Sequence, residues 1–190
     1  WVRGYGLVDS PKVKAQPGKA LNLTAVIAPN AKAAADYYPA NYWYALLEPP
    51  PRSDFPGTGR NGNGIPEVNK TQGSWLGNIK MTNACTQCHQ MGTKVTREIS
   101  PDQKARFKTS VEAWDYRVLI GISGTFMNST LAPLGRQRAL QVFANWTDRI
   151  AKGEIPPVAP PRPAGIERNL VVTEWEWANS KRFVHDEIST

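Results

Sequence analysis

Residues 85–89 read Cys-Thr-Gln-Cys-His, a spacing that constrains both the chemistry and the architecture of the chain. On one turn of a helix, residues at positions i, i+3 and i+4 face the same side. Cys85, Cys88 and His89 would then present two thiols and an imidazole to one flat partner. We therefore expect a short helix over residues 85–90.

The C-x-x-C-H spacing is typical of covalent attachment of a c-type haem. The two thiols can add to the two vinyl groups of the haem while the adjacent imidazole binds the iron. A disulfide or a thioredoxin-like pair would need a βαβ context and gives no role to His89. A zinc site would need further ligands nearby, but the chain has only two Cys, and its other His is His185. We expect one covalent haem c bound by Cys85, Cys88 and His89.

Haem attachment also bears on location. It would use both cysteines, so no disulfide is expected, and it takes place on the outer side of the cytoplasmic membrane or in an equivalent organelle compartment. The sequence therefore predicts an exported protein, periplasmic or extracellular.

The chain begins at Trp1 and reads as a strand from Val2 to Val8, so we expect a processed N-terminus with earlier residues of a larger protein missing. No stretch approaches the roughly 20 apolar residues of a transmembrane helix.

The sixth iron ligand has to reach the haem face opposite His89. Met81 and Met91 are tethered close to the motif and are poor candidates. Met127 lies in a Gly- and Ser-rich stretch that we expect to be a loop between two amphipathic helices, from which it can reach the iron. The alternatives are His185, a water or open position, and a Met that only fills a gap in the core.

Two amphipathic helices are predicted after the motif, and a short one before it, over residues 75–80. Ser100-Pro101-Asp102-Gln103 is typical of a helix start, with Ser as N-cap and Pro at the first position. The last helix is expected over residues 135–152, with Gly153 in the C′ position. The apolar stripes comprise Phe107, Val111, Trp114 and Val118 in the first helix and Ala139, Phe143, Trp146 and Ile150 in the last.

Residues 74–153 resemble a small class I cytochrome c domain, which has a mostly α fold. The resemblance rests on the Cys85–His89 motif, on Trp114-Asp115-Tyr116-Arg117, Gly121 and Met127 before the last helix, and on the aromatic Trp146 within it. It implies that His89 and Met127 ligate the iron, and that the protein carries electrons and is not itself a catalyst. The chain differs from the family in that no Pro adjoins Met127 and more than 70 residues precede the motif.

The flanking segments have a different composition. Residues 1–48 are predicted to be a β-rich partial module, with Leu21, Leu23, Ala25 and Ile27 alternating along one strand, followed by a short helix over 31–35 and an aromatic segment. Residues 1–28 resemble the closing strands of carboxypeptidase-regulatory-like β-sandwich modules of bacterial multidomain proteins. The aromatic segment, Tyr37 to Tyr44, could belong to the core, to an interface or to a lid over the haem edge.

Four segments follow from these patterns. Residues 1–48 form the β-rich and aromatic segment, 49–73 an irregular Pro/Gly-rich connection, 74–153 the cytochrome c domain, and 154–190 a Pro-rich linker. The linker is expected to end in a terminal strand around Asn169–Trp177.

The formal charge of +7 is spread along the chain without a Lys/Arg tract or a recognised nucleic-acid motif, so a nucleic-acid partner is not expected. The basic residues form either a solvated face or a docking surface for an acidic redox protein or neighbouring domain. Two alternative functions stay open. The haem could have an open site in an enzyme or sensor subunit, or the flanks could dock the cytochrome onto a larger assembly.

Overall fold

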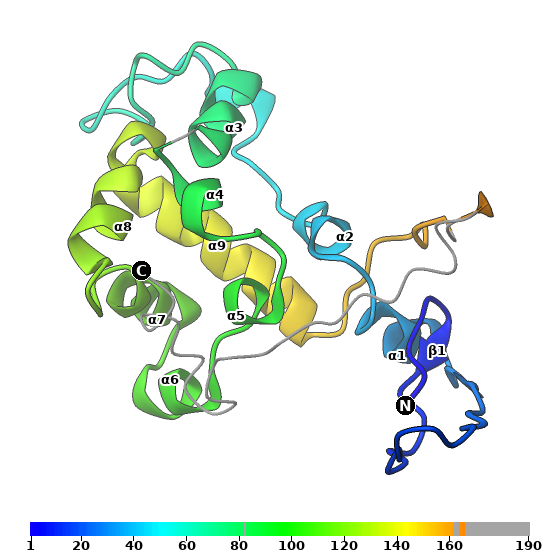
Figure 1. Cartoon of the computed structure of the whole chain (residues 1–190). Helices are drawn as coiled ribbons and strands as arrows, with labels where there is room; N and C mark the ends of the chain where they lie inside the picture. Colours follow the sequence, from blue (N-terminus) through cyan, green and yellow to red (C-terminus); the bar gives the residue numbers. More distant parts are fainter. Residues whose placement is uncertain (82, 162–163, 166–190) are drawn as a thin grey trace.

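A computed structural model describes residues 1–81, 83–161 and 164–165, and in this part the fold is mostly helical with one small two-stranded sheet (Figure 1). The predicted terminal strand around Asn169–Trp177 and the alternative ligand His185 lie outside the described residues. The elements, in chain order, are β1 (Leu7–Val8), β2 (Val26–Ile27), α1 (Ala31–Ala35), α2 (Ala40–Tyr44), the 3-10 helix η1 (Arg52–Asp54), α3 (Gln72–Lys80), α4 (Cys85–Cys88), α5 (Lys94–Arg97), α6 (Pro101–Arg106), α7 (Ser110–Arg117), α8 (Gly124–Thr130), the 3-10 helix η2 (Ala132–Leu134) and α9 (Arg136–Ala151).

The core is built around α9, which runs through the helical part of the molecule with α7 packed along it (Figure 1). Trp146 is completely buried and Phe143 is 2% exposed. The Trp114 ring of α7 stacks on Phe143 with centroids 5.0 Å apart, and its Nε1 donates a hydrogen bond to Thr147 Oγ1 at 3.2 Å. Burying one such aromatic side chain stabilises a fold by roughly 1.5–3 kcal/mol. The predicted apolar stripe of the last helix therefore faces the core.

The helix boundaries confirm some of the sequence signals and correct others. Ser100 caps α6 and accepts a hydrogen bond from the Gln103 N–H at 3.3 Å, and Gly153 follows α9 with φ 93°, both as predicted. The single helix expected from Ser100 to Val118 is instead two. Thr109 and Glu112 form a capping box that starts α7, because Thr109 can satisfy the free backbone N–H groups of a new helix.

The connection predicted over residues 49–73 is irregular over 49–71 apart from η1, because α3 begins at Gln72, three residues before the helix predicted from residue 75. It closes on itself through a hydrogen bond from the Gly57 N–H to the Asn69 carbonyl oxygen at 2.9 Å. It then packs on the start of α9, where Arg138 forms an ion pair with Asp54. Gly135 has φ 76°, and a Cβ atom there would lie 1.9 Å from the Gly64 carbonyl oxygen, so this contact requires glycine.

A set of contacts that we call the strap joins α2 to α9 and to the chain that follows α9. Trp146 Nε1 donates to the Trp43 carbonyl oxygen at 3.0 Å, and Tyr42 Oη donates to the Pro156 carbonyl oxygen at 2.9 Å. Arg149 Nη1 donates to the Leu46 carbonyl oxygen at 2.9 Å. The aromatic segment therefore belongs to the core, and part of this core lies outside residues 74–153.

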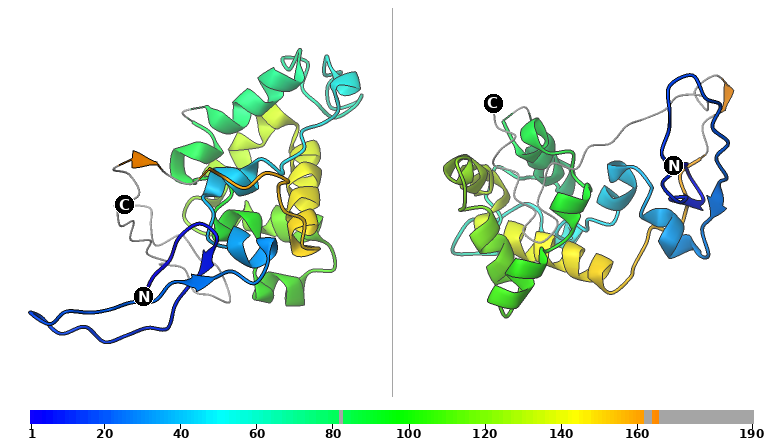
Figure 2. Two further views of the ribbon diagram at one scale, coloured as in Figure 1. Left: turned by 90° about the vertical axis from the view of Figure 1, so that its right-hand side faces the viewer. Right: turned by 60° about the horizontal axis from the view of Figure 1, so that its bottom comes forward.

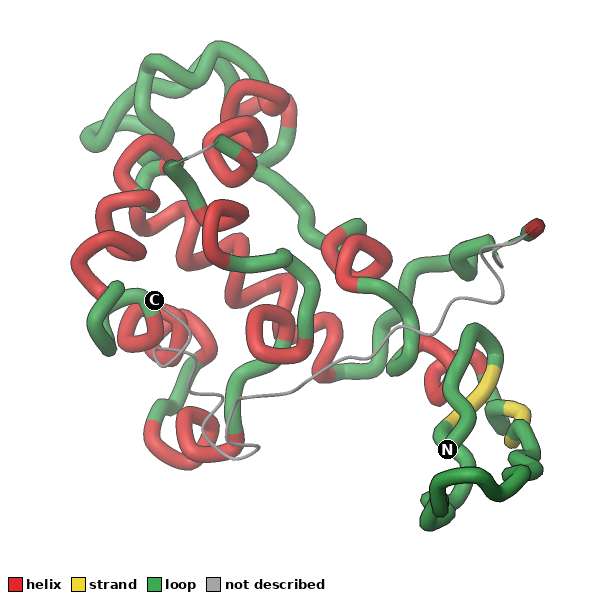
Figure 3. The backbone as a smooth tube through the Cα atoms, in the orientation of Figure 1, coloured by secondary structure: helices red, strands yellow, loops and turns green. Residues whose placement is uncertain are grey.

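The N-terminal segment contains much less sheet than predicted. Leu7 pairs with Ile27 and Val8 with Val26 in an antiparallel ribbon, and the strand expected over residues 21–27 is limited to its last two residues. Residues 11–27 are exposed and project from the body of the molecule (Figure 2), and Figure 3 shows how short the two strands are. A strand needs a partner for its backbone groups, and here a partner is present only at the base of the ribbon.

In the part of the chain that the structure describes, no helix has the length and apolar character needed to cross a membrane.

Candidate functional site

The two thiols of the motif lie on one short turn, α4. This helix spans Cys85–Cys88, and the His89 N–H donates to the Cys85 carbonyl oxygen at 3.0 Å. His89 is the C-cap residue and has extended backbone angles, φ −120° and ψ 131°. The expected helix over residues 85–90 therefore ends at Cys88. At its other end Ala84, the N-cap residue, makes no side-chain hydrogen bond to the helix.

The motif residues differ in exposure. Cys85 is half-buried against the hydrophobic core, His89 is half-buried, and Cys88 is exposed. Burial raises the pKa of the Cys85 thiol, because the thiolate would lose hydration, and a hydrogen bond with Thr130 acts in the opposite direction. Cys85 is thus the anchored thiol of the pair, and Cys88 is open to solvent.

Met127 lies on α8, between Gly124 and Thr130, and not in the loop that we expected. Its backbone N–H donates to the Ser123 carbonyl oxygen at 2.8 Å, and its side chain is half-buried against the core. The chain turns tightly at the start of α8, since a Cβ atom on Gly124 would lie 2.3 Å from the Leu119 carbonyl oxygen. Met127 is therefore held by a helix and does not sit on a flexible arm.

Thr130 connects α8 to the motif. Its hydroxyl donates to the Met127 carbonyl oxygen at 2.7 Å, and it lies close enough to the Cys85 thiol to lower the pKa of that thiol. The structure therefore brings the helix that carries Met127 beside the turn that carries Cys85. The other two methionines are placed differently, since Met81 is 59% exposed and Met91 is buried in the core. Sequence reasoning did not identify Thr130, because one Thr in a Ser/Thr-rich stretch has no distinguishing pattern.

Tyr44 is a second residue of the site that sequence reasoning did not single out. Its hydroxyl is buried and has no hydrogen-bond partner within the described residues. Burial, followed by the neighbouring Cys85, raises the pKa of Tyr44 to about 12. Its ring meets Trp146 edge-on at 6.3 Å, and Lys80 Nζ lies 5.8 Å from the ring centroid. An unpaired buried hydroxyl beside a motif cysteine is a polar group that a bound cofactor could satisfy.

The donor set is compatible with haem. Among the described residues, no three His, Cys, Asp or Glu side chains gather as they would in a zinc or calcium site. Haem brings four nitrogen ligands of its own, so that it needs from the protein only axial ligands and, in the c type, two thiols. Cys85, Cys88 and His89 have this chemistry, and Met127 is on α8, whose Thr130 lines the same cavity as Ala84.

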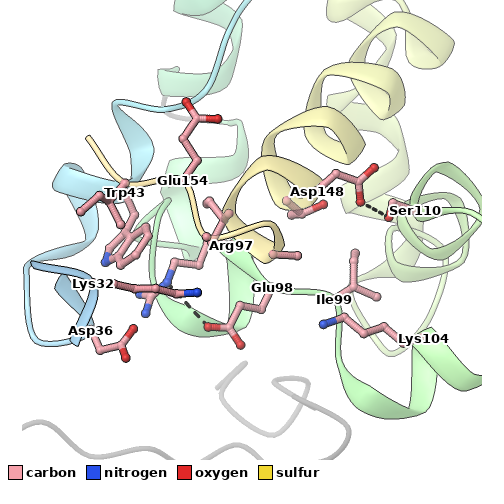
Figure 4. Close-up of a pocket in the computed structure, with 15 residues that line it drawn as sticks. Lys32, Asp36, Trp43, Arg97, Glu98, Ile99, Lys104, Ser110, Asp148 and Glu154 are labelled. Carbon is pink, nitrogen blue, oxygen red and sulfur yellow. Dashed lines mark hydrogen bonds and ion pairs between the residues drawn. The ribbon is translucent and has the colours of Figure 1, made fainter. Parts of the chain in front are cut away.

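Two cavities on the described surface bear on the choice of site. One, of about 300 Å³, lies beside the motif between the end of α3 and α8, and its lining includes Met81, Ala84, Phe126 and Thr130. The other, of about 250 Å³, lies among α1, α2, α5, α6, α7 and the end of α9 (Figure 4).

The second cavity is lined largely by charged and polar side chains, some of which contact one another. Arg97 lies 4.4 Å from the centroid of the Trp43 ring and 3.8 Å from the Glu98 carboxylate, and Ser110 donates to Asp148 (Figure 4). Its lining contains no His or Cys. The cavity beside the motif is therefore the one associated with the candidate cofactor chemistry.

Comparisons of the chain with protein-family models, with curated proteins and with solved structures find no match. The resemblance of residues 74–153 to class I cytochromes c therefore rests on the motif and on the other residues named for it. It stays a prediction.

Proposed function

We propose that the chain is a monohaem c-type cytochrome that transfers electrons. Cys85 and Cys88 hold the haem through thioether bonds, and His89 and Met127 ligate its iron. The observation that carries this proposal is that both thiols lie on one turn, and that Ala84, beside Cys85, and Thr130, on the helix that bears Met127, line the same cavity.

Each residue of the proposed site would have its own role toward the haem. His89 would bind the iron, and the Met127 thioether would favour the reduced state relative to imidazole. When bound, the haem supplies one-electron chemistry between ferrous and ferric iron. The surrounding helices exclude water and hold the ligands, and the electron partner is another redox protein or a neighbouring domain. The attachment chemistry also implies an exported protein.

A second role, docking to a larger assembly, is favoured by the N-terminal segment. Residues 11–27 are exposed, and Leu21, Leu23 and Ile27 among them are large apolar side chains. Exposed strand-like segments of this kind pair with other sheets. Docking is compatible with electron transfer, and deletion of residues 11–25 should leave the redox properties of the haem domain unchanged.

The experiment that tests the proposal is production of the chain in an exporting host with c-type haem maturation, followed by optical spectroscopy and extraction in acidified acetone. The wild-type protein should keep its haem through extraction, and a Cys85→Ala, Cys88→Ala double variant should lose it. Thr86→Ala, on the same exposed turn, is the matched control and should keep it. A double variant with normal haem content and spectrum would contradict covalent attachment.

A further inference from the structure

The N-terminal segment contains a long hairpin that is paired only at its base. Residues 11–27, which we call the arm, are exposed and project from the body of the molecule (Figure 2). The antiparallel pairing ends at Val8 and Val26. Within the described chain, the only backbone hydrogen bond of the arm beyond this base runs from the Lys19 N–H to the Gln16 carbonyl oxygen at 3.2 Å, at the tip. Most backbone groups of the arm are therefore open to a partner.

The two limbs of the arm differ in what they offer to a partner strand. The first limb is interrupted by Pro11 and Pro17, and proline has no backbone N–H to donate to a sheet. The second limb, residues 19–27, contains no proline. A partner strand can therefore pair along the whole second limb, but not along the whole first limb.

The register at the base determines which backbone groups of the second limb point away from the first. The Ala28 N–H donates to the Gly6 carbonyl oxygen at 3.0 Å, so this N–H points toward the first limb. The N–H groups alternate in direction along an extended strand. In a second limb that continues β2, the N–H groups of even-numbered residues therefore point inward, and those of odd-numbered residues point to the free edge.

The side chains of the second limb alternate with the same period. The odd-numbered positions include Leu21, Leu23 and Ile27, and all three side chains are exposed. The even-numbered positions include Asn22 and Thr24. One face of the limb is therefore apolar and uncovered, and a two-stranded hairpin cannot bury such a face by itself. The pattern fits addition to a sheet that buries one of its faces.

The arm is also basic. Residues 10–35 contain no Asp or Glu, and the arm carries Lys12, Lys14 and Lys19. Two copies of the arm would therefore repel one another, whereas carboxylates on a different protein would be attracted. An acidic partner fits the arm better than a second copy of this chain does.

A lipid surface also offers negative charge, but it has no backbone groups to offer. The outward N–H and carbonyl groups of the second limb would lose their water in the hydrocarbon region and gain no partner there. The edge strand of a sheet supplies a partner for each of them. The backbone of the arm therefore favours a sheet over a membrane.

We propose that the second limb of the arm docks by adding a strand to the free edge of an acidic β-sheet in a partner protein. The outward backbone groups of residues 19–27 form the new ladder. The side chains of Leu21, Leu23 and Ile27 extend the apolar face of the partner's sheet, and carboxylates beside its edge attract the three lysines of the arm. This inference rests on the docking role proposed above, and it does not depend on the haem.

The test uses the full chain and, as the probe, a cyclic β-hairpin peptide with one free edge strand that reads Val-Glu-Val-Glu-Val. Backbone amide exchange is followed by NMR at saturating peptide. Strand addition should slow exchange at Leu21, Leu23 and Ala25 by about tenfold, because these N–H groups point to the free edge. Exchange at Asn22 and Thr24, which point inward, should change much less.

Leu23→Pro and Val13→Pro are a matched pair of variants. Each removes one N–H from an odd-numbered, exposed position of the arm, but only Leu23 belongs to the second limb. Leu23→Pro should abolish the slowed exchange and the binding of the peptide, and Val13→Pro should retain both. Because both side chains are exposed, thermal melts of the two variants should match that of the wild type.

The charge of the partner is tested with a second cyclic hairpin, whose edge strand reads Val-Lys-Val-Lys-Val and which should bind more weakly than the acidic one. Lys14→Glu and Lys19→Glu should each weaken binding of the acidic hairpin by about two- to fivefold, as expected for one exposed ion pair. Lys152→Glu, exposed just beyond α9, is the control and should leave the affinity unchanged.

Three results would overturn the proposal in different ways. Equal binding of the two hairpins, with exchange slowed at the odd-numbered positions, would leave docking to a sheet intact and refute an acidic partner. Slowed exchange at Asn22 and Thr24 instead, with either hairpin or with phosphatidylglycerol vesicles, would mean that the arm only closes on itself. Binding of neither hairpin would refute the docking role as well. Electron transfer would be unaffected in each case, because extraction of the haem tests it separately.

Discussion

The helices α4 and α9 show two opposite ways of fixing a helix in a small protein. α9 has 16 residues, and its buried face includes Trp146, Phe143 and Leu140. α4 has four residues, no side-chain N-cap and no fully buried residue. The residues proposed to carry the chemistry therefore lie on one of the shortest helices, while the longest described helix forms the scaffold.

The difference explains where rigidity at the site comes from. An isolated four-residue helix is unstable in water, because one hydrogen bond does not offset the cost of ordering its backbone. α4 is held by its neighbours, through the Cys85 contact with Thr130 and the packing of α3. A covalently bound group would add two further anchors to this turn. The predictions below separate the contribution of the scaffold from that of the site.

The largest effect is expected at Trp146, in the scaffold. Trp146→Ala removes a completely buried side chain and its hydrogen bond to the Trp43 carbonyl oxygen, and should cost about 3–5 kcal/mol of unfolding free energy. Urea denaturation measures the loss. Thr86→Ala, on the exposed surface of α4, should change the free energy by less than about 0.5 kcal/mol. Equal losses in the two variants would remove the distinction between scaffold and site.

The second effect concerns the iron ligand and not the fold. In the holoprotein, Met127→His should keep the iron six-coordinate and lower its reduction potential, and Met127→Ala should open the iron to carbon monoxide. The readouts are potentiometry and the far-red charge-transfer band of a Met–iron bond in the ferric protein. Met81→Leu and Met91→Leu are the controls and should keep the band.

Two results would contradict ligation by Met127. One is rapid, complete binding of carbon monoxide by the reduced wild-type protein at neutral pH. The other is survival of the far-red band in Met127→Ala. Met127 would then be a core residue, and His185 would be the next ligand to test.

The third effect appears only at high pH. Because burial raises the pKa of Tyr44 from 10.0 to about 12, the folded state keeps its proton where the unfolded state releases it. Stability should therefore be independent of this group below pH 10 and should fall as the pH rises from 10 to 12. Thermal melts of the wild type and of Tyr44→Phe should diverge only in that window. If the difference in melting temperature between the two proteins stays constant from pH 8 to 12, burial does not keep the Tyr44 hydroxyl protonated.

The smallest effect is expected at the start of α7. Thr109→Ala removes a side-chain cap whose hydroxyl accepts from the Glu112 N–H at 3.2 Å, and should cost about 1 kcal/mol. Chemical denaturation measures it, with Thr125→Ala on the exposed surface of α8 as the control. A loss as large as that of Trp146→Ala would mean that α7 depends on its cap more than on its packing against α9.

The elements that were predicted correctly are those with local signals. Ser100 and Pro101 start a helix wherever the following residues permit it, and Gly153 ends one because it adopts a positive φ that other residues avoid. The attachment turn at Cys85 was also predicted, because its spacing is local. The strand over residues 21–27 was not, because alternation shows which residues could pair but not whether a partner exists.

The errors near the site have a common cause, which is contact between segments distant in sequence. α8 contains Gly124, Ser129 and Thr130, a composition typical of loops, and it is nevertheless helical, with Met127 packed against the core. Tyr44 could be recognised as part of an aromatic segment, but its position beside Cys85 depends on the folding of the connection between them. Thr130 likewise becomes informative only once α4 and α8 are adjacent.

The strap has a mechanical consequence. It joins Tyr42 of α2 to Pro156, which follows α9, so that these two points of the chain lie side by side. Tension applied between the N-terminal segment and the chain beyond Pro156 would load the bonds at Tyr42, Trp43 and Arg149 first. The helices between them, with α4 and α8, would carry no load until those bonds broke. A force that moves the flanks would thus leave the geometry of the candidate site undisturbed.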